Sequence, residues 1–297
     1  MSSQGLSVVI PVFNRDVREL VQQLLAQLPA WPGPAEVLLL DDGSSTFREQ
    51  NRLLAALPHV RYEELPTNMG RAAVRNRLVA QAQNPWLLLL DNDSNLPDTH
   101  FLARYAAALT AAPVLVGGTC YAAAPPADPA LYLRWHYGRH REARTAALRQ
   151  QAPYGQLTIN NLLIRTEVFR RFGLDESLTR YGHEDTKFGW CLREAAVPVR
   201  HLDNPVRHDG LDPAPVFLQK SHDAVRNLAV LYRTEGLGAD TKLVQTAERL
   251  RKLGLLRLAR TGLAATAAQL QHNLLSAQPS LRVFDALKLH WLLQEWR

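Results

Sequence analysis

Cysteine, long apolar runs and internal repeats are scarce or absent in this sequence of 297 residues. Cys120 and Cys191 are too few and too far apart for a disulfide framework or a metal clip, so we expect two buried thiols without a functional role. No stretch approaches the roughly 20 apolar residues that a membrane-spanning helix needs. The first residues lack the basic start and apolar run of a signal peptide, and we expect a cytoplasmic protein.

Net charge is unevenly distributed along the chain, because acidic residues balance basic ones only in its first part. Residues 1–212 contain 22 Lys and Arg against 22 Asp and Glu, whereas residues 213–297 contain 12 against 6. The whole formal charge of +6 therefore lies in the C-terminal part. This distribution argues against a nucleic-acid-binding core and indicates a basic C-terminal module with its own partner or surface.

The first third of the chain alternates strands with helices. Continuously apolar segments predict four strands, and helical spacing of apolar residues predicts two helices between them. The predicted strands are 6–13, 35–45, which ends in acids and a glycine turn, 59–65 and 86–90, and the predicted helices are 16–28 and 70–82. Apolar strands separated by helices are typical of a parallel sheet covered on both faces. In such α/β sheets, ligands bind outside the carboxyl ends of the strands.

The segment "WLLLLDNDS" ends a predicted buried strand with two carboxylates. Asp91 and Asp93 stand two positions apart, where like charges repel unless a cation neutralises them. Oxygen ligands suit Mg²⁺ or Mn²⁺, which commonly also bind substrate phosphates. The alternative is a solvated turn, because Asp and Asn are common loop residues.

Four segments in order, "VVIPVFNR", "LLLDDGSS", "NMGRAAVRN" and "LLLLDNDS", resemble those of the family 2 glycosyltransferases from residue 6 to about residue 100. The resemblance implies a GT-A fold, a Rossmann-like, mostly parallel central sheet flanked by helices, whose N-terminal half binds a nucleotide-sugar. It also implies that "DND" is a DXD motif that holds Mn²⁺ or Mg²⁺ on the diphosphate, with Asp93 as metal ligand. The donor-binding residues that it implies are Pro11, Phe13, Asn14, Arg15, Asp42, Asn68, Gly70, Arg71, Asp91 and Asn92.

Elementary chemistry is compatible with these roles. Asp42 offers an acceptor to a base N–H or a ribose hydroxyl, whereas Asp41 is a candidate cap of the next turn. Gly70 permits a tight turn before a helix whose N-terminus, with Arg71, favours negative charge. The alternative for Arg71 is a solvated helix residue.

The second half contains "FGLDESLTRYGHEDTKFGWCL" and then "VRHDG", which resemble the acceptor half of inverting galactosyltransferase-like enzymes. By this resemblance Asp185 is the catalytic base, and Tyr181, His183 and Glu184 bind the acceptor. Tyr181 stands where tryptophan is common and His183 replaces a small residue, so a different acceptor pocket is expected. The alternative is that the acids merely open a helix.

His208 follows at the family's spacing from these acids. The resemblance makes it the second metal ligand beside Asp93, since a neutral imidazole is a good ligand for Mn²⁺. His201 is a weaker rival for the same role.

The remaining segments give the predicted domain organisation. We expect a GT-A domain over 1–212, with a donor half at 1–100 and an acceptor half at 101–212, and a basic helical extension at 213–297. Within the acceptor half, the Ala-, Pro- and Arg-rich segment 121–153 is expected to cross the active-site face. Residues 241–265 predict a basic amphipathic helix that packs on its own protein first, with a second subunit or anionic lipid as alternatives.

The leading functional hypothesis is therefore a metal-dependent inverting glycosyltransferase. It would move a hexose or N-acetylhexosamine from a nucleoside diphosphate, UDP first, to a glycan or lipid-linked acceptor. The alternatives are a sugar-1-phosphate nucleotidyltransferase, which normally has a glycine-rich loop that "IPVFNR" lacks, and a non-catalytic glycan-binding protein on the same fold.

Overall fold

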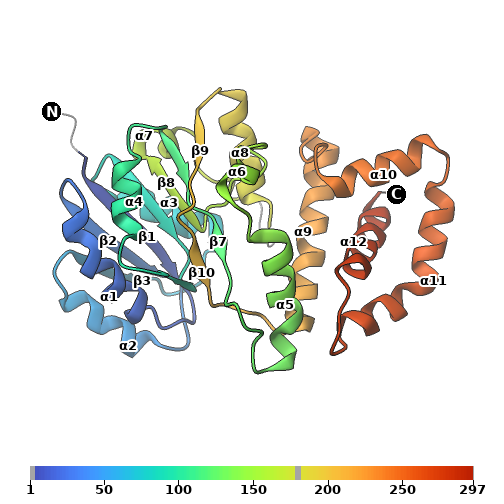
Figure 1. Ribbon diagram of the computed structural model, residues 1–297, viewed down its shortest axis with the longest axis horizontal. Coiled ribbons are helices and arrows are strands. Elements are labelled where there is room, and N and C mark those ends of the chain that lie inside the picture. Colours follow the sequence, from blue (N-terminus) through green and yellow to red (C-terminus); the bar gives the residue numbers. More distant parts are fainter. Residues whose placement is uncertain (1–3, 178–181, 297) are drawn as a thin grey trace. The chain divides into compact units, whose positions relative to one another are not determined.

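A computed structural model describes residues 4–177 and 182–296 (Figure 1). Within these residues the chain forms two compact units. The first contains 4–122, 142–177 and 184–210, and the second contains 123–141, 182–183 and 211–296. The segment 123–141, which the sequence placed in the acceptor half, thus belongs to the same unit as the C-terminal helices.

A seven-stranded sheet organises the first unit. Its strand order is β3-β2-β1-β4-β8-β6-β9, in which β8 runs antiparallel to β4 and β6 while the other pairs are parallel. A smaller sheet has the order β5-β10-β7. The strands are β1 (Leu6–Val12), β2 (Ala35–Asp41), β3 (Val60–Glu64), β4 (Trp86–Leu90), β5 (Ser94–Asn95), β6 (Val114–Val116), β7 (Thr119–Cys120), β8 (Asn161–Arg165), β9 (Val199–His201) and β10 (Val206–His208).

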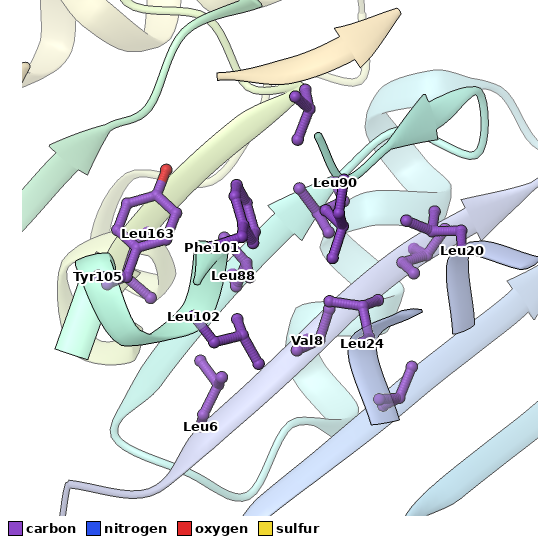
Figure 2. Close-up of a cluster of buried hydrophobic side chains, with 14 of the residues drawn as sticks. Leu6, Val8, Leu20, Leu24, Leu88, Leu90, Phe101, Leu102, Tyr105 and Leu163 are labelled. Carbon is purple, nitrogen blue, oxygen red and sulfur yellow. The ribbon is translucent and has the colours of Figure 1, made fainter. Parts of the chain in front are cut away.

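Two apolar cores lie on opposite faces of the large sheet, because successive side chains of a strand alternate between faces. One face packs against α1 and α4, as Figure 2 shows for Leu20 and Leu24 of α1 and Phe101 of α4. The other face packs against α3, α7 and α8. The helices of this unit are α1 (Arg18–Gln27), α2 (Arg48–Arg52), α3 (Arg71–Gln81), α4 (Phe101–Ala107), α6 (Ala146–Arg149), α7 (Thr166–Phe172) and α8 (Glu184–Glu194).

The second unit is helical and has its own core. Phe284, Leu287 and Leu292 of α12 are fully or almost fully buried there, together with Val244 of α10. Its helices are α5 (Tyr132–Tyr137), α9 (Ala214–Glu235), α10 (Lys242–Lys252), α11 (Leu256–Leu274) and α12 (Leu281–Glu295). None of the helices within 4–177 and 182–296 has the length and apolar character needed to cross a bilayer.

The predicted strands and helices of the first third are confirmed to within one or two residues, except that the second strand ends at Asp41, before the acids and glycine turn that were predicted to close it at 45. The sheet is mostly parallel with helices on both faces. One helix prediction is wrong: residues 241–265 do not form a single helix. Gly254 adopts a left-handed φ of +72°, which ends α10 and turns the chain into α11. Cys120 and Cys191 are free thiols and only partly buried, so the expectation of buried thiols was too strong.

Candidate active site

The carboxyl ends of β1 and β2 form the first part of the site. Asn14, which follows β1 with a left-handed φ of +49°, accepts hydrogen bonds through Oδ1 from the backbone N–H groups of Ser45 and Thr46 at 2.7 and 3.2 Å. Its own N–H donates to Ser44 Oγ. Pro11 is half-buried in β1, and the Phe13 ring is 46% exposed beside this junction. These contacts join the "FNR" and "DDGSS" segments into one surface.

Asp41 and Asp42 have different structural tasks. Asp41 caps the following turn by accepting from the Ser44 N–H at 2.7 Å, as the sequence suggested. Asp42 is 4% exposed, and its two oxygens accept from the backbone N–H groups of Met69 and Gly70 at 2.7 and 3.2 Å. Burial raises the pKa of Asp42 although these hydrogen bonds lower it. Asp42 therefore holds the loop that leads into α3, and a contact with a donor nucleotide stays a prediction.

The start of α3 directs positive charge towards the end of β4. Gly70 has a φ of +93° just before the helix, as its predicted turn requires, while the side chain of Asn68 is exposed in the same loop. Arg71 Nε lies 3.2 Å from Glu184 Oε1, and its Nη2 lies 3.7 Å from Asp91 Oδ2. Arg71 is therefore not a simple solvated helix residue: it bridges the "DND" and "HED" segments.

Asp91 is chiefly an ion-pair partner. Arg75, only 5% exposed, makes a short salt bridge to Asp91 and donates to the Arg71 carbonyl oxygen at 2.9 Å. The neighbouring Asn92 donates to the Phe13 carbonyl oxygen at 3.3 Å, so β1 and β4 are tied together at their carboxyl ends. Sequence reasoning missed Arg75, although its position four residues after Arg71 places both on the same side of α3.

Asp93 and His208 lie side by side. Asp93 Oδ1 is 3.3 Å from His208 Nδ1, yet this buried oxygen has no hydrogen bond from any residue within the described ranges. Burial by itself would raise the pKa of Asp93, but the interaction with His208 and the charges of Arg15 and Arg71 outweigh it and hold that pKa below its ordinary value. A buried carboxylate oxygen 3.3 Å from an imidazole nitrogen is an arrangement suited to a shared cation.

Two residues that the sequence did not single out shape this pair. A Cβ on Gly210 would lie 2.1 Å from Asp93 Oδ2, so only glycine leaves room for the carboxylate. The Tyr121 ring meets the His208 imidazole edge to face at 5.6 Å between centroids, and its hydroxyl donates a short hydrogen bond to Glu142. "HDG" after β10 was the available signal for Gly210, since a glycine can mark a close approach.

Glu184 and Asp185 occupy the first turn of α8, where acids also favour the helix dipole. Burial and, next, the neighbouring Glu184 raise the pKa of Asp185 to about 7, against a smaller lowering by Arg71. His183, directly before the helix, has a left-handed φ of +73°. Tyr181 lies outside the described residues. A carboxylate with this pKa can accept a proton near neutral pH.

His201, the weaker rival as metal ligand, is committed elsewhere. Its Nδ1 accepts from the buried guanidinium of Arg149 at 2.7 Å, and its Nε2 donates to the Pro153 carbonyl oxygen at 2.9 Å. Burial, the largest cause, and Arg149 lower the pKa of His201. Both ring nitrogens are therefore used in the fold, which leaves His208 as the histidine beside Asp93.

Comparison with known proteins identifies the family. The sequence model of glycosyl transferase family 2 matches residues 7–171, which is more than half of the chain. The chain belongs to glycosyltransferase family 2. The predicted family and GT-A fold are thus confirmed, while the matched region ends before "HED", so the galactosyltransferase-like acceptor half stays a prediction.

Individual relatives are distant. An uncharacterized glycosyltransferase of Haemophilus influenzae is 32% identical over 95 residues, which cover 31% of this chain. The match spans only 38% of the length of that curated relative. These figures add support for the family but carry no information on a substrate.

Solved structures of similar fold cover nearly the whole chain. A mannosyltransferase, PcManGT from Pyrobaculum calidifontis, solved with GDP-Man and Mn²⁺, has a TM-score of 0.59 and 15% identity over 97% of this chain and 85% of its own. S. aureus TarS, residues 1–349, has a TM-score of 0.50 and 17% identity over 98% and 91%. The same fragment in complex with UDP also has a TM-score of 0.50, with 19% identity over 98% and 91%. At these identities the likeness shows the fold alone.

Proposed function

We propose that this family 2 glycosyltransferase moves a hexose or N-acetylhexosamine from a nucleoside diphosphate sugar to an acceptor hydroxyl, with inversion at the anomeric carbon. UDP is the first candidate nucleotide, and a glycan or lipid-linked molecule is the proposed acceptor. The observation that carries the proposal is the bridging position of Arg71, 3.2 Å from Glu184 and 3.7 Å from Asp91. Through it the proposed donor side and the proposed base belong to one cluster. Similar folds solved with UDP and with GDP-Man and Mn²⁺ support a nucleotide-sugar donor.

The residues present suit a divalent cation. Asp93 and His208 would hold Mn²⁺ or Mg²⁺, and the buried Asp93 Oδ1 without a hydrogen bond supports this assignment. Among the residues of 4–177 and 182–296, no group of three or more His, Cys, Asp or Glu side chains gathers into a metal site. The remaining ligands would come from the donor diphosphate and water, as is common for such ions. When bound, the cation would offset the negative charge of the departing diphosphate.

The chain's own residues supply the rest of the chemistry. Arg15 and Arg71, whose charges act on Asp93, would attract the diphosphate to the start of α3. Glu184 would position the acceptor through a hydrogen bond to one of its hydroxyls. Asp185 would take the proton of the attacking hydroxyl as the new C–O bond forms and the bond to the diphosphate breaks, with its electron pair leaving on the nucleotide.

The alternatives are weaker on different grounds. Membership of family 2 counts against a sugar-1-phosphate nucleotidyltransferase. A non-catalytic glycan-binding protein would have no need to keep "DND", "HED" and "VRH" in one chain, with Arg71 between Asp91 and Glu184.

A donor screen tests the proposal. Nucleotide-sugars are incubated with the full chain and Mn²⁺, hydrolysis is measured for each, and the anomeric configuration of the transferred sugar is then determined by NMR. The proposal predicts a preferred UDP-sugar and an inverted anomer. Turnover of no nucleotide-sugar would contradict the donor assignment, and a retained anomer would contradict single displacement.

A further inference from the structure

The corner between α10 and α11 exposes three leucines. Leu253, Leu255 and Leu258 are 66%, 43% and 72% exposed. The two helices are already anchored by other side chains, because Val244 and Ala247 are fully buried and Leu256, Leu263 and Leu270 pack partly against the same core. The corner leucines are therefore apolar surface that the internal packing of this unit leaves uncovered.

The turn at Gly254 creates this surface. Gly254 has a φ of +72° and ends α10, so residues 241–265 do not form the predicted single helix. The apolar residues of this segment therefore do not all lie on one buried helix face. Leu243 and Leu256 face the core, whereas Leu253 and Leu258 do not. In Figure 1 the corner is the orange turn where α10 passes into α11.

Basic side chains outnumber acidic ones around the corner, where Glu248 is the neighbouring acid. Residues 249–284 contain six Lys and Arg and no Asp or Glu, which equals the formal charge of +6 of the whole chain. Arg251 is paired with Glu248 at 2.7 Å, and Arg260 donates to the Trp296 carbonyl oxygen at 2.8 Å. Three further exposed cations, Arg249, Lys252 and Arg257, have no carboxylate within ion-pair distance in the part of the chain that the structure describes.

We propose that this basic leucine corner, made of Leu253, Leu255, Leu258, Arg249, Lys252 and Arg257, docks on an anionic phospholipid bilayer. Exposed leucines next to several cations match the boundary between acyl chains and anionic headgroups. A second copy of the chain would bring the same positive charges face to face, which opposes self-association through this corner.

Docking would give the transferase access to acceptors held at a membrane surface. That consequence, a lipid-linked acceptor, rests on the proposed function, whereas the docking itself does not. Lipid binding and donor hydrolysis can therefore fail independently, and they are measured separately.

Sedimentation of the full chain with vesicles tests the proposal. Vesicles of phosphatidylcholine alone are compared with vesicles in which about one third of the lipid is phosphatidylglycerol, at low and high salt. Binding is expected only to the anionic vesicles, with release by salt. Each basic residue near an anionic surface contributes about fivefold to partitioning, so Arg249→Gln with Lys252→Gln and Arg257→Gln should weaken binding about a hundredfold.

Matched variants separate the corner from general effects. Leu253→Ser with Leu258→Ser should abolish sedimentation. Two control variants should leave it unchanged: Leu275→Ser changes a leucine that is 54% exposed at the other end of α11, and Arg282→Gln removes an exposed cation outside the corner. Thermal melting checks folding, and donor hydrolysis in solution should be unchanged in all of them.

Three outcomes would overturn the proposal. They are no binding to anionic vesicles, binding that neither set of corner variants reduces, and a dimer in light scattering that the leucine variant dissociates while vesicles do not bind. The last outcome would assign the corner to a contact between two copies.

Discussion

Gly210→Ala is the substitution that disturbs the proposed metal ligands most directly without replacing either Asp93 or His208. The added Cβ would lie 2.1 Å from Asp93 Oδ2 and 2.7 Å from Asp93 Cβ and Cγ, far inside normal contact distance. Either Asp93 or the chain after β10 must move by about 1 Å. A misplacement of that size can cost about 10²-fold in activity, and overpacking of this kind costs about 1–3 kcal/mol of stability.

Calorimetric titration of UDP with Mn²⁺ measures the effect on the site, and urea denaturation measures the effect on the fold. Gly262→Ala in α11 is the matched control, because a Cβ there meets nothing within 4 Å and should stabilise the helix by about 0.5–1 kcal/mol. We expect Gly210→Ala to lose most of the Mn²⁺-dependent UDP affinity while Gly262→Ala keeps it. Wild-type affinity in Gly210→Ala would refute the view that Asp93 needs this space to act as a ligand.

Three further predictions concern the same cluster. Chelation with EDTA should weaken UDP binding, and Asp93→Ala should cause the same loss without unfolding the protein. Equal affinity for UDP in calorimetric titrations with and without EDTA would contradict the metal assignment. Arg75→Met should lower the free energy of unfolding by about 3 kcal/mol, because it leaves the mostly buried Asp91 carboxylate without its main partner. A loss below about 1 kcal/mol in urea denaturation would show that Arg71 alone is enough to pair Asp91. Burial raises the pKa of Asp185 from 3.8 to about 7, so the folded state holds this proton more tightly than the unfolded state and its stabilising effect disappears as the pH rises from about 4 to 7. Asp185→Asn should therefore gain stability relative to the wild type at pH 8 compared with pH 5, by at most about 3 kcal/mol, because about two pH units of the shift lie within that range. A pH-independent difference in urea denaturation would contradict the raised pKa.

The strands and helices of the donor half could be predicted because their signals are local. Val8 and Ile10 of β1 and Leu88 and Leu90 of β4 are fully or almost fully buried, as continuous apolar runs indicate for a parallel sheet. Polar clusters after such strands meet at one edge of the sheet, which is why the predicted donor residues lie near one another.

The contacts that organise the site depend on pairs far apart in sequence. The Arg71–Glu184 contact, the close approach of Gly210 to Asp93 and the edge-to-face contact of Tyr121 with His208 join residues that no periodicity relates. A motif also cannot show that both carboxylate oxygens of Asp42 accept hydrogen bonds from backbone N–H groups. Only the folded chain reveals which polar groups are already satisfied.

The prediction of a single helix across Gly254 was wrong for a different reason. An isolated glycine in a helical pattern is tolerated at a cost of about 1 kcal/mol, so the pattern alone did not require a break. Its left-handed backbone, together with the full burial of Val244 on one side and the partial burial of Leu256 on the other, favours two helices.

The Asp185→Asn variant tests the central claim most directly, because it separates proton acceptance from donor binding. The amide keeps the size of the side chain but cannot take the acceptor proton. We predict unchanged calorimetric affinity for UDP with Mn²⁺, together with a fall of about 10²–10⁴-fold in transfer to the acceptor measured in a single turnover. Transfer at the wild-type rate with an inverted product would contradict the assignment of Asp185 as the base and make Glu184 the first residue to examine.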